Sequence, residues 1–134
     1  MRQQIAALGL QDHVRLLGFV PDGDLPAAYR AASLTVVPTH ALEGFGLIVA
    51  ESLAAGTACL VTPVGGLPAA VEALSPELVL RGADAASIAD GVIGALSGTR
   101  LMPDAEACRE FARQHYDWPV IAARVRAVYE AVQR

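Results

Sequence analysis

The sequence is poor in charged and aromatic residues and has no long apolar run. Only 18% of its 134 residues are charged and 5% are aromatic, whereas ordinary globular chains carry about 25% charged residues. This composition excludes a disordered chain and favours a well-buried domain. No apolar stretch approaches the roughly 20 residues of a membrane-spanning helix, and residues 1–4 lack the apolar core of a signal peptide. We therefore expect a cytoplasmic protein.

A clustered basic excess is also missing. The net charge is −4, the sequence pI is about 5.2, and the ten basic residues are scattered along the chain. A nucleic-acid-binding surface normally needs such a cluster, so a nucleic-acid partner is excluded. The two cysteines, Cys59 and Cys108, lie in apolar segments, and no His or Cys stands at metal-ligand spacing. We expect two buried reduced thiols and no metal site.

Short β-branched or leucine-rich runs alternate with helix-like stretches, which is typical of βα units around a parallel sheet. The predicted strands are residues 14–18, 34–38, 58–62 and 78–80. The predicted helices are residues 2–8, 25–32, 85–96, 104–115 and 119–133. The length suits a single domain with one core. The expected fold class is α/β, with a doubly wound, Rossmann-like parallel sheet of about four strands and helices at the C-terminal end.

Several helix ends carry recognisable signals. Gly9 can end the first helix in the left-handed conformation, and Asp22 or Asp24 can cap the second. The last helix is amphipathic, with Asp117 placed to cap it and Pro119 suited to its first turn. Its apolar residues follow helical spacing at Ile121, Val125, Val128 and Val132.

The most informative stretch is residues 38–51, where a predicted strand ends, a loop follows and a helix begins near Gly46. The carboxyl edge of a parallel sheet is where open α/β folds bind ligands. Gly44 and Gly46 flank Phe45 and let backbone N–H groups approach an anion, such as a phosphate, at the helix N-terminus. Such a glycine pair is a weak signal alone, because many helix starts use glycine for packing.

Two glutamates stand out in this stretch. Glu51 lies in a helix whose neighbouring residues are almost all apolar, where an unpartnered carboxylate is costly. It is either a surface residue at a seam of the fold or a bidentate acceptor for ribose hydroxyls, as acidic residues are in doubly wound folds. Glu43 either caps the helix or contacts a sugar hydroxyl. His40 adjoins the same loop, although an isolated histidine is more often structural or solvent-facing.

A second loop, residues 62–68, follows the next strand and should line the same crevice. It contains Gly65 and Gly66. The alternative for this segment is a simple glycine turn that places Pro68 in the first turn of a helix.

Three segments taken together resemble the retaining GT-B glycosyltransferases known as group 1 or family 4. They are Leu-Gly-Phe-Val-Pro at 17–21, Glu-Gly-Phe-Gly at 43–46 with Glu51 after it, and Val-Gly-Gly-Leu-Pro at 64–68. The resemblance runs in order over residues 2–133. It implies a nucleotide-diphosphate-sugar donor, retention of anomeric configuration, and neither cofactor nor metal.

The resemblance also implies residue roles. Glu43 would contact the donor sugar and act in catalysis, and Glu51 would hold the ribose. Gly44, Phe45, Gly46 and Leu47 would bind sugar and diphosphate, and Gly65 and Gly66 would complete the donor site from the second loop. Residues 18–20 would touch the nucleobase. Ala69 departs from the family, which commonly has a glutamate at this place.

A larger departure concerns what the family has before these segments. Two further βα units, which carry an Arg and a Lys for the diphosphate, and an acceptor domain are not in this sequence. The chain is therefore predicted to be part of a donor-binding domain, residues 1–134, that is inactive alone and cannot reveal its acceptor. The alternatives are a non-catalytic nucleotide-sugar-binding or partner-completing module, or part of a GT-B-like nucleotide-sugar epimerase.

The missing units also predict a rearranged sheet. In the strand order 3-2-1-4-5-6, the four predicted strands correspond to the third to the sixth, which leaves a hole between residues 14–18 and 34–38. An unpaired edge promotes association with other chains. We expect strand 14–18 to move in beside strand 34–38 and form a contiguous four-stranded sheet, with dimerisation as the alternative.

Overall fold

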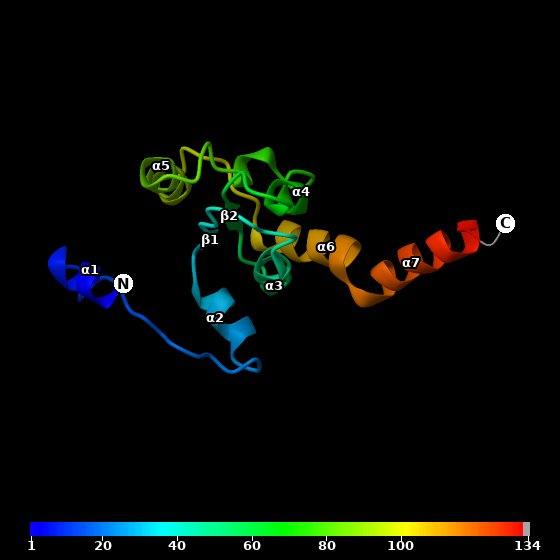
Figure 1. Cartoon of the computed structure of the whole chain (residues 1–134), viewed down its shortest axis with the longest axis horizontal. Helices are drawn as coiled ribbons and strands as arrows, with labels where there is room; N and C mark the ends of the chain where they lie inside the picture. The colour runs from blue at the N-terminus through cyan, green and yellow to red at the C-terminus, as the bar shows by residue number, and fades with distance from the viewer. Residues whose placement is uncertain (133–134) are drawn as a thin grey trace.

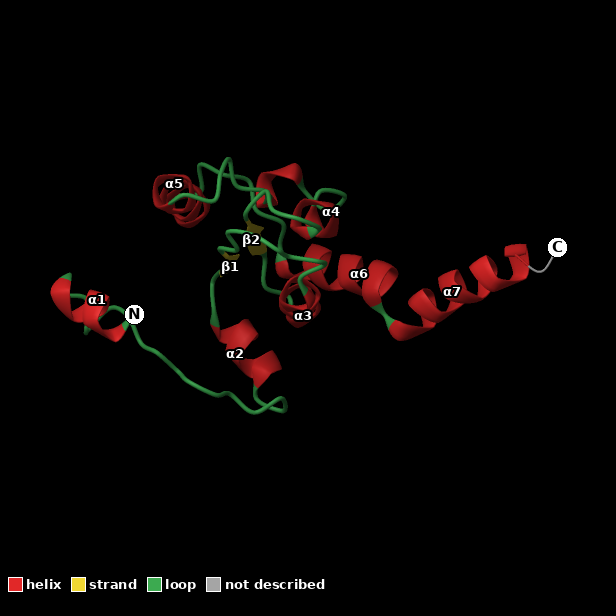
Figure 2. Ribbon diagram, in the orientation of Figure 1, coloured by secondary structure: helices red, strands yellow, loops and turns green. Residues whose placement is uncertain are grey.

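The computed structural model describes residues 1–132 (Figure 1). The elements in chain order are α1 (Arg2–Ala7), α2 (Leu25–Ala31), β1 (Thr35–Val37), α3 (Leu47–Ala55), β2 (Cys59–Val61), α4 (Leu67–Val71), the 3-10 helix η1 (Pro76–Leu78), α5 (Ala85–Ser97), α6 (Ala105–Tyr116) and α7 (Trp118–Val132). Figure 2 shows how far helices and loops outweigh the strands. No helix in residues 1–132 is long and apolar enough to cross a membrane.

A small parallel sheet forms the centre of the fold. β1 and β2 pair in parallel, with Thr35 opposite Cys59 and Val37 opposite Val61. A single parallel bridge from Val61 to Val79 extends the sheet by one more segment. Helices lie around the strands in Figure 1. The α/β fold class with a parallel sheet is thus confirmed, whereas the expected strand count is too high.

The core lies on the face of the sheet covered by α3 and α6. Val49 and Leu53 of α3 are fully buried there, together with Cys108 of α6. The opposite face is covered by α5, because a Cβ on Gly91 would overlap the side chain of Leu80 and stand 3.7 Å from Cδ1 of Leu60 in β2. Successive side chains of β2 point to opposite faces of the sheet. This short strand therefore packs against helices on both sides.

Most helix predictions are confirmed within a residue or two. Gly9 has φ +66° just after α1, and the Asp104 carboxylate caps α6 by accepting from the Ala107 N–H at 2.8 Å. Asp117 accepts from the N–H of Trp118 at 2.9 Å at the start of α7. Asp24 is the N-cap residue of α2 but makes no side-chain capping bond. Residue 133, the predicted end of the last helix, lies outside the described residues.

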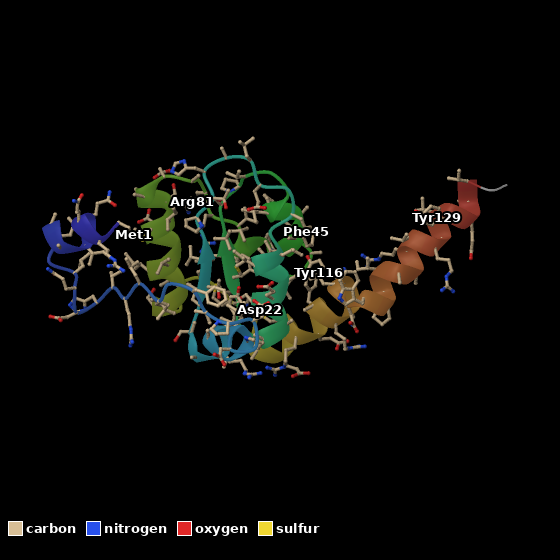
Figure 3. The ribbon with its side chains drawn as sticks, turned by 60° about the horizontal axis from the view of Figure 1, so that its bottom comes forward. Met1, Asp22, Phe45, Arg81, Tyr116 and Tyr129 are labelled. Carbon is tan, nitrogen blue, oxygen red and sulfur yellow. The ribbon has the colours of Figure 1, made fainter. Side chains whose placement is uncertain are left out.

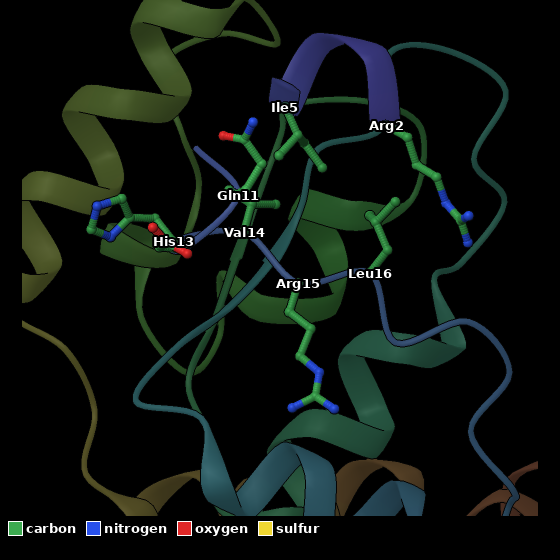
Figure 4. Close-up of a pocket in the computed structure, with 8 residues that line it drawn as sticks. Arg2, Ile5, Gln11, His13, Val14, Arg15 and Leu16 are labelled. Atoms are coloured by element: carbon green, nitrogen blue, oxygen red, sulfur yellow. The ribbon is translucent and has the colours of Figure 1, made fainter. Parts of the chain in front are cut away.

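Residues 14–18 are not a strand, and the predicted contiguous four-stranded sheet is wrong. This segment makes no ladder with β1 and runs apart from the sheet (Figure 1). It lines a pocket of about 510 Å³ with Arg2 and Ile5 of α1 (Figure 4). A strand is stabilised by its neighbour, and the space between this segment and β1 holds no strand among residues 1–132. Phe19 is accordingly 87% exposed.

The other predicted strand that differs is residues 78–80. Leu78 ends the 3-10 helix η1, and the segment joins the sheet through a single bridge between Val79 and Val61. The backbone N–H of Leu80 donates to the Val61 carbonyl at 2.8 Å. Pro76 starts η1, since proline suits a first helical turn. This short helix takes up Leu78, the first residue of the predicted strand.

The amphipathic pattern of α7 is present but finds no partner in residues 1–132. No residue of α7 is buried, and Val125, Val128 and Val132 are all exposed. The helix extends away from the body of the fold (Figure 1).

The expectation of two buried reduced thiols is confirmed. Cys59 and Cys108 are both free and fully buried. Burial raises the pKa of the Cys59 thiol to about 12 and that of Cys108 to about 11. Both thiols therefore stay protonated at neutral pH.

Candidate functional site

The two loops that follow β1 and β2 are tied together where the strands end. Thr62 is fully buried, and its hydroxyl donates to the Thr39 carbonyl at 2.7 Å. The N–H of Thr62 also donates to the Val37 carbonyl at 3.3 Å. Thr62 thus continues the β1–β2 pairing into the loops and fixes how they leave the sheet. The sequence indicated both loops but not this threonine.

Further along, the loops touch backbone to backbone, and this contact requires two glycines. A Cβ at Gly65 would overlap the carbonyl of Glu43, and a Cβ at Gly66 would overlap the carbonyl of Gly44. Gly65 also has φ +56°, in the left-handed region. The N–H of Gly66 donates to the Glu43 carbonyl at 3.3 Å. The structure therefore brings the predicted residues of the two loops into one site.

Gly46 starts α3 in a conformation that other residues adopt at a cost. Its φ is +78° and ψ is 66°, and a Cβ there would stand 2.5 Å from Cδ2 of Leu67. Among residues 1–132, the N–H groups of Gly46 and Leu47 donate to no protein acceptor. These N–H groups lie at the positive end of a nine-residue helix, which favours an anion.

An aromatic cluster supports the first loop from α6. The ring of Phe45 meets the ring of Tyr116 edge to face, with centroids 5.5 Å apart (Figure 3). The Tyr116 hydroxyl donates to the Ala70 carbonyl in α4, and burial raises the pKa of Tyr116. The ring of Phe111 also meets the ring of Tyr116 edge to face, with centroids 5.8 Å apart. Tyr116 therefore links the Phe45 loop to the helix that follows the second loop.

Glu51 lies in the second turn of α3 and is exposed. Its Oε2 accepts a hydrogen bond from the Tyr29 hydroxyl of α2 at 3.0 Å. Desolvation, and then the bond to Glu51, raises the pKa of Tyr29 to about 12. Glu51 is thus an exposed carboxylate with one hydrogen-bond partner, at a seam between two helices.

The rim of the site is apolar and open. Leu42 is 103% exposed and has φ 61°, and Leu47 is 70% exposed. Glu43 is half-buried, and His40 is exposed. Residues 18–20, the predicted nucleobase contact, lie on the segment that runs apart from the sheet, so they are not brought to these loops.

The fold and the two glycine loops define an α/β domain of the GT-B glycosyltransferase type. Residues 1–115 match the family model described as "Glycosyl transferases group 1", and the chain belongs to this family. Sucrose-phosphate synthase from Thermosynechococcus elongatus has a similar structure, with a TM-score of 0.79 and 27% identity, over 98% of this chain and 33% of that chain.

Two curated relatives are also similar to this chain over part of their own length. The D-inositol 3-phosphate glycosyltransferase of Thermobispora bispora is 41% identical over 139 residues, which cover 96% of this chain and 30% of the relative. The phosphatidyl-myo-inositol mannosyltransferase of Mycobacterium leprae is 31% identical over 124 residues, which cover 92% of this chain and 33% of the relative. The chain therefore spans about a third of the length of the relatives it matches.

Proposed function

We propose that this chain is part of the donor-binding domain of a glycosyltransferase and binds a nucleotide-diphosphate sugar. The observation that carries the proposal is the N-terminus of α3, where Gly46 and Leu47 present free N–H groups beside a loop locked by Gly65 and Gly66. A diphosphate is the anion that such N–H groups and a helix dipole suit. The membership of the group 1 family gives this anion site its chemical context.

The residue roles follow from position along α3. The diphosphate lies at the N-terminus, with Phe45, Gly46 and Leu47 around it. Glu51, one turn further along the helix, receives the ribose hydroxyls, since an acidic residue commonly does so in doubly wound folds. Glu43, which precedes Gly44 in the loop, contacts the transferred sugar.

The reaction is transfer of the sugar to an acceptor with retention of anomeric configuration. Negative charge develops on the diphosphate oxygen as the sugar leaves, and fixed dipoles stabilise that charge. The α3 N-terminus supplies such a dipole without a metal or a cofactor. Cationic groups for the same oxygens are proposed to come from another part of the complete enzyme, because no basic residue of this chain matches the family's pair.

The space between residues 14–18 and β1 supports the assignment to a larger domain. In the doubly wound strand order, two further strands would lie between these segments. The similarity to sucrose-phosphate synthase extends over both segments at once. We accordingly propose that residues 1–134 form part of a domain whose remaining strands fill this space.

An NMR titration of the ¹⁵N-labelled chain with uridine and guanosine diphosphates tests the proposal. We expect weak binding, with a Kd in the millimolar range, and the largest amide shifts at Gly46, Leu47 and Gly65. The corresponding nucleosides, which lack the diphosphate, should shift these amides much less. Shifts confined to other parts of the chain, or no shifts with either diphosphate, would refute it.

A further inference from the structure

The partner of Glu51 is Tyr29 of α2, whose side chain makes a hydrogen bond to α3. The Tyr29 hydroxyl donates to Oε2 of Glu51 at 3.0 Å. Because the pKa of Tyr29 is raised to about 12, the hydroxyl keeps its proton and remains a donor throughout the neutral range. The direction of this hydrogen bond is therefore fixed, from tyrosine to carboxylate.

The backbone of Tyr29 is held independently of its side chain. The Thr57 hydroxyl donates to the Tyr29 carbonyl at 2.7 Å. Thr57 is itself joined to α3, because the buried Ser52 hydroxyl donates to the Thr57 carbonyl at 2.8 Å. The same hydroxyl lies 2.8 Å from Oγ1 of Thr35 in β1. These bonds attach α2 to the core, so the Tyr29 hydroxyl is not needed to hold the helix in place.

Glu51 borders two surface hollows, and the tyrosine holds its carboxylate toward one of them. One hollow, of about 610 Å³, lies between α2 and α3 and includes Leu25, Tyr29 and Glu51. The other, of about 400 Å³, lies between α3 and α6 and includes Arg109 and Arg113. These arginines pair with Glu106 and Glu110 of α6, and a glutamate freed from Tyr29 could also turn into this second hollow. Tyr29 therefore restricts an exposed side chain that would otherwise have several rotamers.

We infer that Tyr29 is a positioning residue that holds the Glu51 carboxylate ready for the two ribose hydroxyls of the donor. The inference rests on the proposed function, since Glu51 must be the ribose acceptor. A carboxylate has about four acceptor sites on its two oxygens. Tyr29 occupies one site on Oε2, which leaves Oε1 and the other site of Oε2 for a bidentate contact. Pre-ordering the acceptor reduces the entropy lost on binding.

The test compares Tyr29→Phe with wild type in binding of uridine or guanosine diphosphate and of the matching 2′-deoxy compound. Phenylalanine keeps the ring and the backbone contacts and removes only the hydroxyl. We expect Tyr29→Phe to weaken binding of the ribonucleotide about 3- to 10-fold, which corresponds to the loss of one ordinary hydrogen bond. Binding of the 2′-deoxy compound should change less than about 2-fold. Tyr129→Phe, on the exposed face of α7, is the matched control and should change neither.

A second background separates positioning from a structural effect. In Glu51→Gln, wild-type preference for the ribonucleotide should be reduced, and adding Tyr29→Phe should reduce it no further. If Tyr29→Phe weakens binding of both nucleotides equally, or weakens binding of neither, the inference is overturned. The proposed function still stands in that case, provided that the wild type prefers the ribonucleotide. If the wild-type chain binds neither nucleotide, the proposed function fails and the inference fails with it.

Discussion

Alanine at Gly65 should break the contact that joins the two site loops. Two effects combine at this position. The left-handed φ of +56° costs a residue with a Cβ about 1–2 kcal/mol. The new Cβ also overlaps the Glu43 carbonyl, which must move and weaken its hydrogen bond from Gly66, at a further cost of about 1–2 kcal/mol. We expect Gly65→Ala to lower the free energy of unfolding by about 2–4 kcal/mol.

Two other glycines separate these effects. Gly98 has φ +76° with no atom within 4 Å of a Cβ, so Gly98→Ala should show only the conformational cost. Gly66 has φ −82°, which alanine adopts freely, so Gly66→Ala should show only the overlap with the Gly44 carbonyl. Urea unfolding followed by circular dichroism measures all three variants. If Gly65→Ala is no more destabilising than Gly98→Ala, or if Gly66→Ala is neutral, the loops do not depend on this close approach.

Further predictions concern the glutamates, a helix cap and the thiols. Glu51→Ala should weaken nucleoside diphosphate binding by the chain about 10-fold, the loss of a charge-assisted bond, whereas Glu43→Ala should leave it nearly unchanged in the same titration; equal losses would contradict the two roles. Asp84 is the N-cap residue of α5, and hydrogen bonds from Ser87 lower the pKa of its carboxyl below 3.8. The stability that the ionised carboxylate gives to the fold is therefore fully present above pH 3.8 and is lost as the pH falls through the lowered pKa. Asparagine also caps helices but does not titrate, so Asp84→Asn should not show this acid-dependent loss when unfolding is measured across that pH interval. If wild type and Asp84→Asn lose stability in parallel, the result is evidence against the cap. Cys59 and Cys108 should react with a thiol reagent at pH 8 only after unfolding, because their pKa values are about 12 and about 11; rapid labelling of the native chain would show that the core opens.

Local sequence signals predicted most of the fold because they act over a few residues. Asp117 accepts a hydrogen bond at the start of the helix that it was expected to cap, and the apolar run at β2 is buried throughout. Residues 14–18 have the composition of a strand but find no neighbour to pair with among residues 1–132, and pairing is decided by distant parts of a chain. The resemblance indicated that the two intervening βα units are absent, but the local pattern could not show whether residues 14–18 would pair with residues 34–38 instead.

The candidate site was likewise predictable only in part from the sequence. The glycine loops were predictable, since Gly44, Gly46, Gly65 and Gly66 follow strand ends in the sequence. The residues that support them were not, because their roles arise from contacts between distant segments. Thr62 reaches back across 23 positions to Thr39, Tyr29 reaches 22 positions forward to Glu51, and Tyr116 reaches 46 positions back to Ala70. A threonine directly after a buried strand is the only local hint among the three.

A structure of the 134-residue chain with a nucleoside diphosphate at saturating concentration tests the central claim most directly. The account predicts diphosphate oxygens within hydrogen-bond distance of the Gly46 and Leu47 N–H groups, and ribose hydroxyls on the Glu51 carboxylate while Tyr29 still donates to it. A nucleotide bound elsewhere, or a diphosphate held away from the start of α3, would contradict the account.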